Sequence, residues 1–146
     1  MDFDVAAILT DPERAWFTVE PATEVALDAF RAGCQHRVPG TLLAFWRFSN
    51  GGECNDLALP PMRFALDRVE DATSALSAKF ETEEFPGLVF FGGNGGLEWI
   101  ALDYRSSESP CIVMVDPIAG LESAMKIADS VEQLVLTIGV PYDDKA

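Results

Sequence analysis

Apolar residues recur at helical spacing through the first half of the chain. Residues 23–34 predict one helix, which Thr23 or Thr18 can cap. Residues 39–49 predict a second helix, and residues 68–80 predict a third that is more polar. The second helix has the widest apolar face, so we expect it to be buried. Its apolar residues are Leu42, Leu43, Phe45 and Trp46.

Shorter apolar runs in the middle of the chain predict strands. Residues 88–91 and 97–102 are expected to pair as an antiparallel hairpin, because a short Gly/Asn connection separates them. Residues 111–115 predict a third strand from their β-branched content, and residues 57–59 predict a shorter one. A last helix is expected to begin at Asp129.

The order of these elements predicts one α+β domain over residues 1–146, with helices at both ends of a central run of strands. A chain of this length can form one continuous core. Residues 1–17 carry scattered apolar side chains and are expected to add a short helix over that core. Trp16 and Phe17 in this segment are either core residues or exposed anchors for a partner.

Two glycine-rich segments separate the predicted elements. The first contains Asn50, Gly51 and Gly52, and the second contains Gly92, Gly93, Asn94, Gly95 and Gly96. Both are predicted to be structural turns, because Asn and Gly tolerate positive φ; we expect it at Gly51 or Gly52. The alternative for the second segment is a phosphate-binding loop. That loop would need a following helix and a nearby cation, and the sequence indicates neither.

Three segments, in this order, resemble the signatures of the SUKH superfamily. Residues 38–46 followed by 50–52 are similar to the family's Leu-Pro-x-x-Tyr-x-x-Phe-Leu helix and its Asn-Gly-Gly turn. Residues 91–103 resemble the family's Phe-Gly, glycine-rich turn and aromatic-x-Ala-Leu-Asp strand. Residues 127–134 are similar to its closing Ala-Asp-Ser helix. Val38, Leu42, Trp46, Val131 and Leu134 depart from the family pattern but keep apolar side chains.

The resemblance implies a central, mostly antiparallel sheet flanked by helices, with the family core at about residues 20–138 and an N-terminal extension at 1–19. It also implies a non-catalytic protein-binding module. Such modules are most often bacterial immunity proteins, which neutralise a cognate toxin of a polymorphic toxin system, frequently a nuclease. The alternative within the family is a housekeeping regulatory or scaffold protein.

The chain is strongly acidic, with 24 Asp and Glu against 10 Lys and Arg and a formal charge of −14. This balance disfavours nucleic acid and anionic membrane surfaces as partners, and it favours a basic protein, here a basic toxin. Solubility alone is the other explanation of the charge. The acidic N-terminus is unlike a signal peptide, and no apolar run is long enough to span a bilayer, so we expect a cytoplasmic protein.

The densest acidic cluster, between Phe80 and Phe85, is the first candidate for a partner-binding surface. The full candidate set is Glu53, Asp56, Glu81, Glu83, Glu84 and Glu98. The alternative for the cluster is a solvated loop. For Glu53, Asp56, Glu98 and Asp103 the alternatives are solvated turns, a catalytic carboxylate pair or a calcium site, although no calcium-loop motif is present.

The sequence predicts no catalytic residues, no metal and no cofactor. His36 is the only histidine, and it lacks a nucleophile motif. It lies two residues after Cys34, but no second cluster completes a metal site, and Cys54 and Cys111 lack paired spacing. We therefore expect a binding protein rather than an enzyme.

Overall fold

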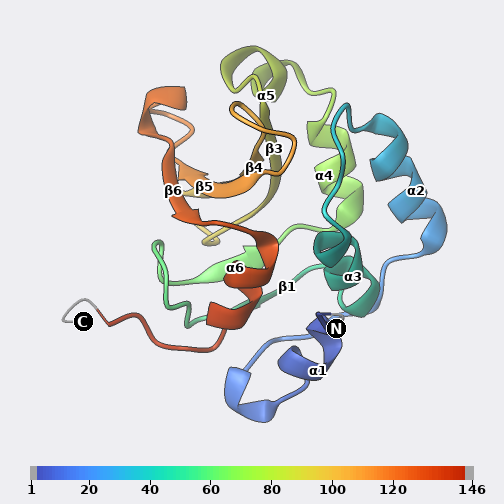
Figure 1. Cartoon of the computed structure of the whole chain (residues 1–146), viewed down its shortest axis with the longest axis vertical. Helices are drawn as coiled ribbons and strands as arrows, with labels where there is room; N and C mark the ends of the chain where they lie inside the picture. The colour runs from blue at the N-terminus through green and yellow to red at the C-terminus, as the bar shows by residue number, and fades with distance from the viewer. Residues whose placement is uncertain (1–2, 144–146) are drawn as a thin grey trace.

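The structure, a computed structural model, describes residues 3–143. Within this range, six strands form one antiparallel sheet whose spatial order follows the chain, from β1 to β6 (Figure 1). The strands are β1 (Gly52–Cys54), β2 (Phe64–Leu66), β3 (Leu88–Gly93), β4 (Trp99–Asp103), β5 (Cys111–Val115) and β6 (Met125–Ala128). The prediction of an α+β domain with an antiparallel sheet is confirmed.

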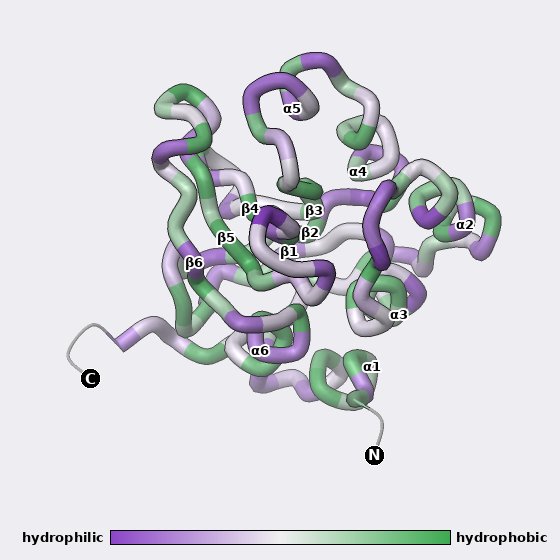
Figure 2. The backbone as a smooth tube through the Cα atoms, turned by 45° about the horizontal axis from the view of Figure 1, so that its top comes forward, coloured by the Kyte–Doolittle hydropathy of each residue, from purple (hydrophilic) through white to green (hydrophobic). Residues whose placement is uncertain are grey.

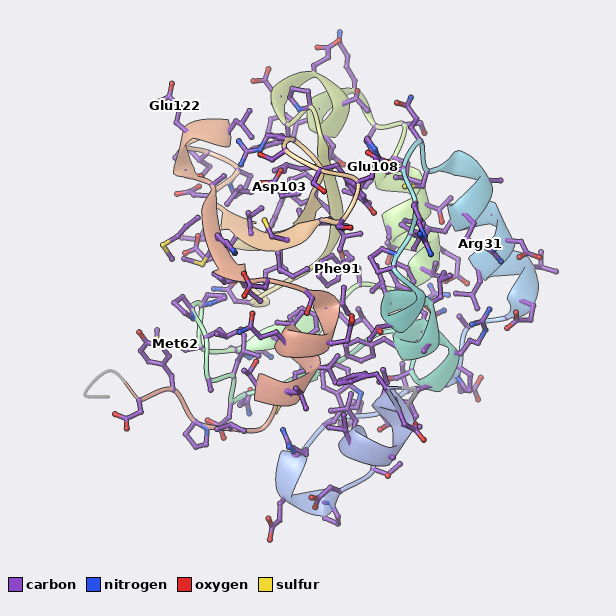
Figure 3. The ribbon with its side chains drawn as sticks, viewed as in Figure 1. Arg31, Met62, Phe91, Asp103, Glu108 and Glu122 are labelled. Carbon is purple, nitrogen blue, oxygen red and sulfur yellow. The ribbon has the colours of Figure 1, made fainter. Side chains whose placement is uncertain are left out.

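Helices cover one face of this sheet and build the main core. The elements are α1 (Val5–Leu9), η1 (Pro12–Arg14), α2 (Glu24–Gly33), α3 (Gly40–Phe48), α4 (Val69–Ala75), α5 (Lys79–Glu84), η2 (Leu121–Ser123) and α6 (Val131–Thr137). Side chains of α1, α2, α3, α4 and α6 join the inner-face residues of the strands in one buried cluster. Phe91 of β3 lies in the interior, whereas Arg31 and Glu122 project outward (Figure 3).

The outer face of the sheet carries a second, smaller cluster. Phe90, Ala101 and Val113 lie side by side on β3, β4 and β5, and Phe85 packs against them at the end of α5. The backbone coloured by hydropathy is hydrophobic along β5 and mostly hydrophilic in α5 (Figure 2). The outer face therefore has a thinner cover than the inner face.

Predicted helices agree with the structure where the apolar pattern is long. Helix α2 begins after Thr23, whose Oγ1 accepts a hydrogen bond from the Ala26 N–H at 3.1 Å. Helix α3 begins one residue after Pro39 and buries Leu42, Leu43, Phe45 and Trp46 as expected. The N-terminal segment contributes Val5 and Leu9 to the main core.

Trp16 and Phe17, left open by the sequence, differ in their surroundings. Trp16 is buried, and its indole N–H donates to Ser49 Oγ at 3.3 Å. Phe17 is 67% exposed, and its backbone pairs with Glu53 of β1. Trp16 is therefore a core residue. Of the two, only Phe17 is exposed enough to contact a partner.

The first glycine-rich segment lies between α3 and β1. Gly51 has φ +116° and Gly52 has φ +110°, so the expected positive φ occurs at both residues. Gly52 is already the first residue of β1. Asn50 reaches away from the turn: its Oδ1 accepts the Val69 N–H at 2.7 Å, which caps the start of α4.

The prediction of one helix over residues 68–80 is wrong. Two helices, α4 and α5, occupy this region, and residues 76–78 separate them. Val69 and Ala72 of α4 belong to the main core, whereas Phe80 of α5 packs against Phe85 and Trp99 on the outer face. One straight helix cannot reach both faces of a sheet, so the chain breaks between them.

Other differences concern short elements. Residues 57–59 do not form a strand; Leu57 makes one bridge to Ile138, and β2 forms at Phe64–Leu66 instead. The last helix begins at Val131 after a Ser130 cap, because the residues before it form β6. Three- and four-residue strands give too few alternating positions for a periodic pattern.

Candidate functional site

A recess of about 340 Å³ opens on the outer face beside α5. Its floor follows from the strand register, which places Ala65 of β2 beside Gly93 of β3, and Gly93 beside Trp99 of β4. Two small residues next to a large indole leave a depression in the sheet surface. Leu88 and Phe90 of β3 belong to the outer-face cluster with Phe85, and Phe90 also lines the recess.

Four acidic residues line this recess: Asp67, Asp71, Glu81 and Glu98. They come from the segment that leads into α4, from α4, from α5, and from the turn before β4. No Lys, Arg or His belongs to the described residues that line it. We call this site the acidic recess.

The acidic residues of the recess are not neutralised by neighbouring cations. Across residues 3–143, no ion pair within 4.0 Å involves any of the four. Arg63 approaches from the side of β2, but its guanidinium binds Glu53 at 2.8 Å and the Asn94 carbonyl oxygen at 2.7 Å. The recess therefore keeps its negative charge in the free protein.

The surroundings of Asp67 in the recess shift its pKa. Asp67 is exposed as a whole residue, yet its pKa is raised to about 6. The first cause is partial desolvation by the surrounding protein, and the second is the negative charge of Asp71. A nearby cation would remove part of this penalty, because it favours the ionised carboxylate.

The position of Asp67 is fixed through its backbone. The Trp46 indole N–H donates to the Asp67 carbonyl oxygen at 2.8 Å, and the Asp67 N–H donates to the Phe91 carbonyl oxygen. Asn50 holds the next turn, since its Nδ2 also donates to Glu70 Oε1 at 2.8 Å. The first glycine-rich segment thus positions one wall of the recess.

The second glycine-rich segment forms the opposite wall. Gly92 and Gly93, expected in the turn, are instead the last two residues of β3, because they pair with Leu66 and Ala65 of β2. The turn proper begins at Asn94. Its Oδ1 accepts the N–H groups of Gly96 at 2.8 Å and Glu98 at 3.2 Å, which places Glu98 at the recess.

An aromatic cluster borders the recess on the α5 side. Trp99 lies in edge contact with Phe90 and Phe80, with ring centroids 5.3 Å and 6.0 Å apart. Phe80 is 45% exposed, so an apolar surface adjoins the acidic one. This combination suits a ligand that is both cationic and partly apolar.

The structure separates the predicted partner-binding acids. Glu81 and Glu98 line the recess. Glu53 is paired with Arg63 beside β2, and Asp56 lies exposed in the loop after β1. Glu83 and Glu84 are exposed on α5, which is a helix and not the solvated loop of the alternative. Their contact with a partner stays a prediction.

Asp67 and Asp71 were missed by the sequence analysis. Asp67 continues β2 past Leu66, whereas Asp71 lies in the first turn of α4, so only the fold brings the two carboxylates to the same recess. Asp103, considered as a catalytic carboxylate, is bound by Arg105 at 2.8 and 2.9 Å, and this guanidinium lowers its pKa. Asp103 therefore has a structural partner.

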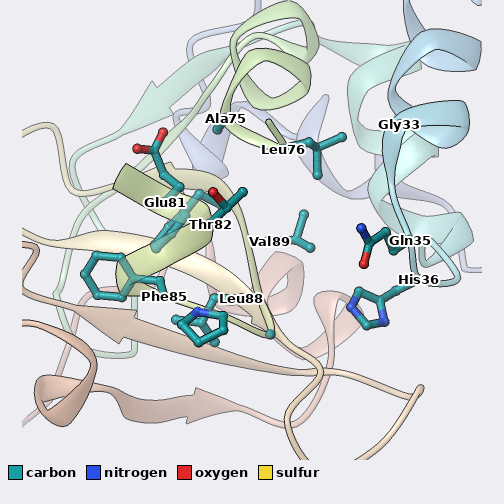
Figure 4. A pocket seen from close by; sticks show the side chains of 13 residues that line it. Gly33, Gln35, His36, Ala75, Leu76, Glu81, Thr82, Phe85, Leu88 and Val89 are labelled. Carbon is teal, nitrogen blue, oxygen red and sulfur yellow. The ribbon is translucent and has the colours of Figure 1, made fainter. Parts of the chain in front are cut away.

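A second recess, of about 280 Å³, lies on the other side of α5 (Figure 4). Gln35 and His36 lie on one side of it, and Glu81 and Thr82 lie opposite. His36 Nδ1 is 2.8 Å from Glu108 Oε2, and its ring stacks on Tyr104. These contacts join the α2–α3 loop to the β4–β5 loop, so His36 has a structural role here.

The part of the chain that the structure describes contains no group of three or more His, Cys, Asp or Glu residues that could hold a metal ion. None of its helices is long and apolar enough to cross a membrane. The fold is that of a single α+β domain with an antiparallel sheet. The chain belongs to the SMI1/KNR4 family (SUKH-1), whose model matches residues 21–137. Domains of this family are generally non-catalytic binding modules, and comparison with curated proteins gave no match.

Proposed function

We propose that this protein is a bacterial immunity protein that neutralises a basic cognate toxin by direct binding in the cytoplasm. The observation that carries the proposal is the acidic recess, whose four carboxylate residues have no cation partner among the described residues. Asp67 and Asp71 are exposed and Glu81 and Glu98 are half-buried, so all four carboxylates are open to a partner's cations. An unpaired acidic recess in a binding module is therefore suited to a partner that supplies the cations.

The net charge supports the same partner. A surface at −14 attracts a basic protein over several ångströms and repels nucleic acid, so it can compete with the nucleic acid for a basic nuclease. Neutralisation by occupancy needs no chemistry. The inhibitor acts stoichiometrically, and it is not an enzyme.

The experiment is co-expression with the product of the adjacent gene. We expect the two proteins to co-purify and the toxicity of that product to disappear. A titration of purified toxin should reach full inhibition near one equivalent. Toxicity that persists despite stable expression would contradict the immunity role, and permanent inactivation by a small fraction of an equivalent would show that the protein is an enzyme.

The charge of α5 gives a second readout. Glu83→Lys with Glu84→Lys should slow association with the toxin, and raising the salt concentration should slow it in wild type, because exposed charges are screened over ~8–10 Å. The matched control is Glu13→Lys with Glu20→Lys, which reverses two exposed charges at the N-terminal segment. Equal slowing by both pairs would mean that net charge alone acts, without a role for the α5 surface.

The second candidate is a housekeeping regulatory or scaffold protein of the same family. Gene position separates the two, since an immunity gene is expected directly beside its toxin gene. A conserved, toxin-free neighbourhood together with a non-toxic partner would favour the scaffold role.

A further inference from the structure

From the acidic recess and the sheet residues that form its floor, we infer that the recess receives one arginine side chain of the partner protein. This inference rests on the proposed function, because it names the contact that the same surface makes with its partner.

The floor of the recess suits the aliphatic part of an arginine side chain. Gly93 is buried and carries no side chain, Ala65 is half-buried and carries one methyl group, and the half-buried Trp99 is paired with Gly93 on the next strand. A chain of methylene groups laid over this floor would bury apolar surface against all three residues. A volume of about 340 Å³ is at the low end of the range for ligand pockets, roughly 300–1,000 Å³, and suits a side chain better than a cofactor.

The rim suits a delocalised cation. The four acids of the rim come from the segment before α4, from α4, from α5 and from the turn before β4, so a planar head with several N–H donors can contact more than one of them. An arginine head also stacks on an indole and is more weakly hydrated than an ammonium group. Both properties favour arginine over lysine next to Trp99.

Charge decides between the possible occupants. A second copy of this chain also carries −14, and two such surfaces repel each other. A bound divalent cation would require clustered ligands, and residues 3–143 contain no such group. A basic partner remains, and its arginine matches both the floor and the rim.

The test uses the isolated protein and a small probe. We would titrate ¹⁵N-labelled protein with N-acetyl-arginine methylamide and, in parallel, with N-acetyl-citrulline methylamide, which has the same shape without the charge. Arginine should shift the amide signals of Gly93 and Gly95 and the indole signal of Trp99. Citrulline should bind at least about tenfold more weakly, because it forms no charge-assisted contacts.

Two variants examine the rim and the floor separately. Asp67→Asn with Asp71→Asn should weaken arginine binding about tenfold, whereas Glu13→Gln with Glu20→Gln, which removes the same charge elsewhere, should leave it within about twofold. Ala65→Leu should block the floor without changing any charge. Each variant is compared only after its amide spectrum shows the wild-type fold.

The inference is overturned if the arginine and citrulline probes shift the same signals equally. It is also overturned if the arginine probe binds the Asp67→Asn, Asp71→Asn variant and the Ala65→Leu variant as tightly as it binds wild type. Tighter binding of N-acetyl-lysine methylamide than of the arginine probe would also overturn it. These results are independent of co-purification with a toxin. If the arginine probe does not bind but the toxin co-purifies, this inference fails and the proposed function stands. If the probe binds but no toxin co-purifies, the recess binds arginine and the proposed function fails.

Discussion

Gly51 and Gly52 offer a matched pair of substitutions at the turn that leads into the sheet. Both residues have positive φ, at +116° and +110°, so alanine at either position places a side chain in a disfavoured backbone conformation. Their surroundings differ. A Cβ at Gly51 would meet Arg68 Cγ at 3.5 Å, an ordinary contact. A Cβ at Gly52 would overlap the Phe17 carbonyl oxygen and lie 2.8 Å from Trp16 Cζ2.

The two substitutions should therefore lower the free energy of unfolding by different amounts. Gly51→Ala should lower the free energy of unfolding by about 1–2 kcal/mol from backbone strain alone. Gly52→Ala carries the same strain and adds an overlap that must push Phe17 or Trp16 away, which costs about 1–3 kcal/mol more. The expected loss for Gly52→Ala is therefore about 2–5 kcal/mol. The displaced Phe17 also carries the bridge to Glu53, so the edge of β1 should loosen as well.

Urea unfolding at pH 7, followed by circular dichroism and tryptophan fluorescence, measures both losses. A midpoint shift at constant slope reports the change in stability. In thermal unfolding, 1 kcal/mol corresponds to about 2–4 °C for a domain near this size. Equal losses for the two variants would refute the steric part of the reasoning. A larger loss at Gly51 than at Gly52 would refute the assignment of the close contact to Gly52.

Three further predictions concern hydrogen bonds and charge. Asn50→Ala removes the cap on the Val69 N–H and should lower the free energy of unfolding by ~1–2 kcal/mol, which urea unfolding measures. Ser49→Ala removes the hydroxyl that accepts from the buried Trp16 indole and the partly buried Val19 N–H and donates to the Gly51 carbonyl oxygen, so it should lower the free energy of unfolding by ~2–4 kcal/mol. Ser49→Thr keeps a hydroxyl and should lose less stability than Ser49→Ala in the same urea unfolding. For Asp67, desolvation and the charge of Asp71 raise the folded-state pKa to about 6, so its contribution to stability decreases as pH rises from about 4 to 6. Asp67→Asn should therefore gain stability relative to wild type over that interval, as measured by urea unfolding at each pH. A stability difference that is the same at pH 4 and pH 7 would contradict the raised pKa of Asp67.

The long strands could be predicted from the sequence because each carries its own signal. Residues 88–91 and 111–115 are continuous apolar runs, and the structure buries most of β3 and β5 between two hydrophobic clusters. Strands β1, β2 and β6 have three or four residues each, and their pairing depends on neighbours that the local sequence does not specify. The break between α4 and α5 has the same origin, since each helix packs against a different face of the sheet.

The acidic recess could be predicted only in part, because its shape and its charge have different origins. Local density identified Glu81, and proximity to a turn identified Glu98; both line the recess. A high density of acidic residues along the sequence also identified Glu83 and Glu84, however, and these two lie on the exposed surface of α5 and not in the recess. The floor of the recess depends on the register that aligns residues 65, 93 and 99 across three strands. The sequence around each of these residues contains no signal from which that alignment could be predicted. Once the register is known, Asp67 follows, since it continues β2 past Leu66 toward the same opening. Strand pairing forms the recess at which the four acidic residues gather. Ala65→Leu fills the floor of this recess, so it should weaken cation binding although it changes no charged residue.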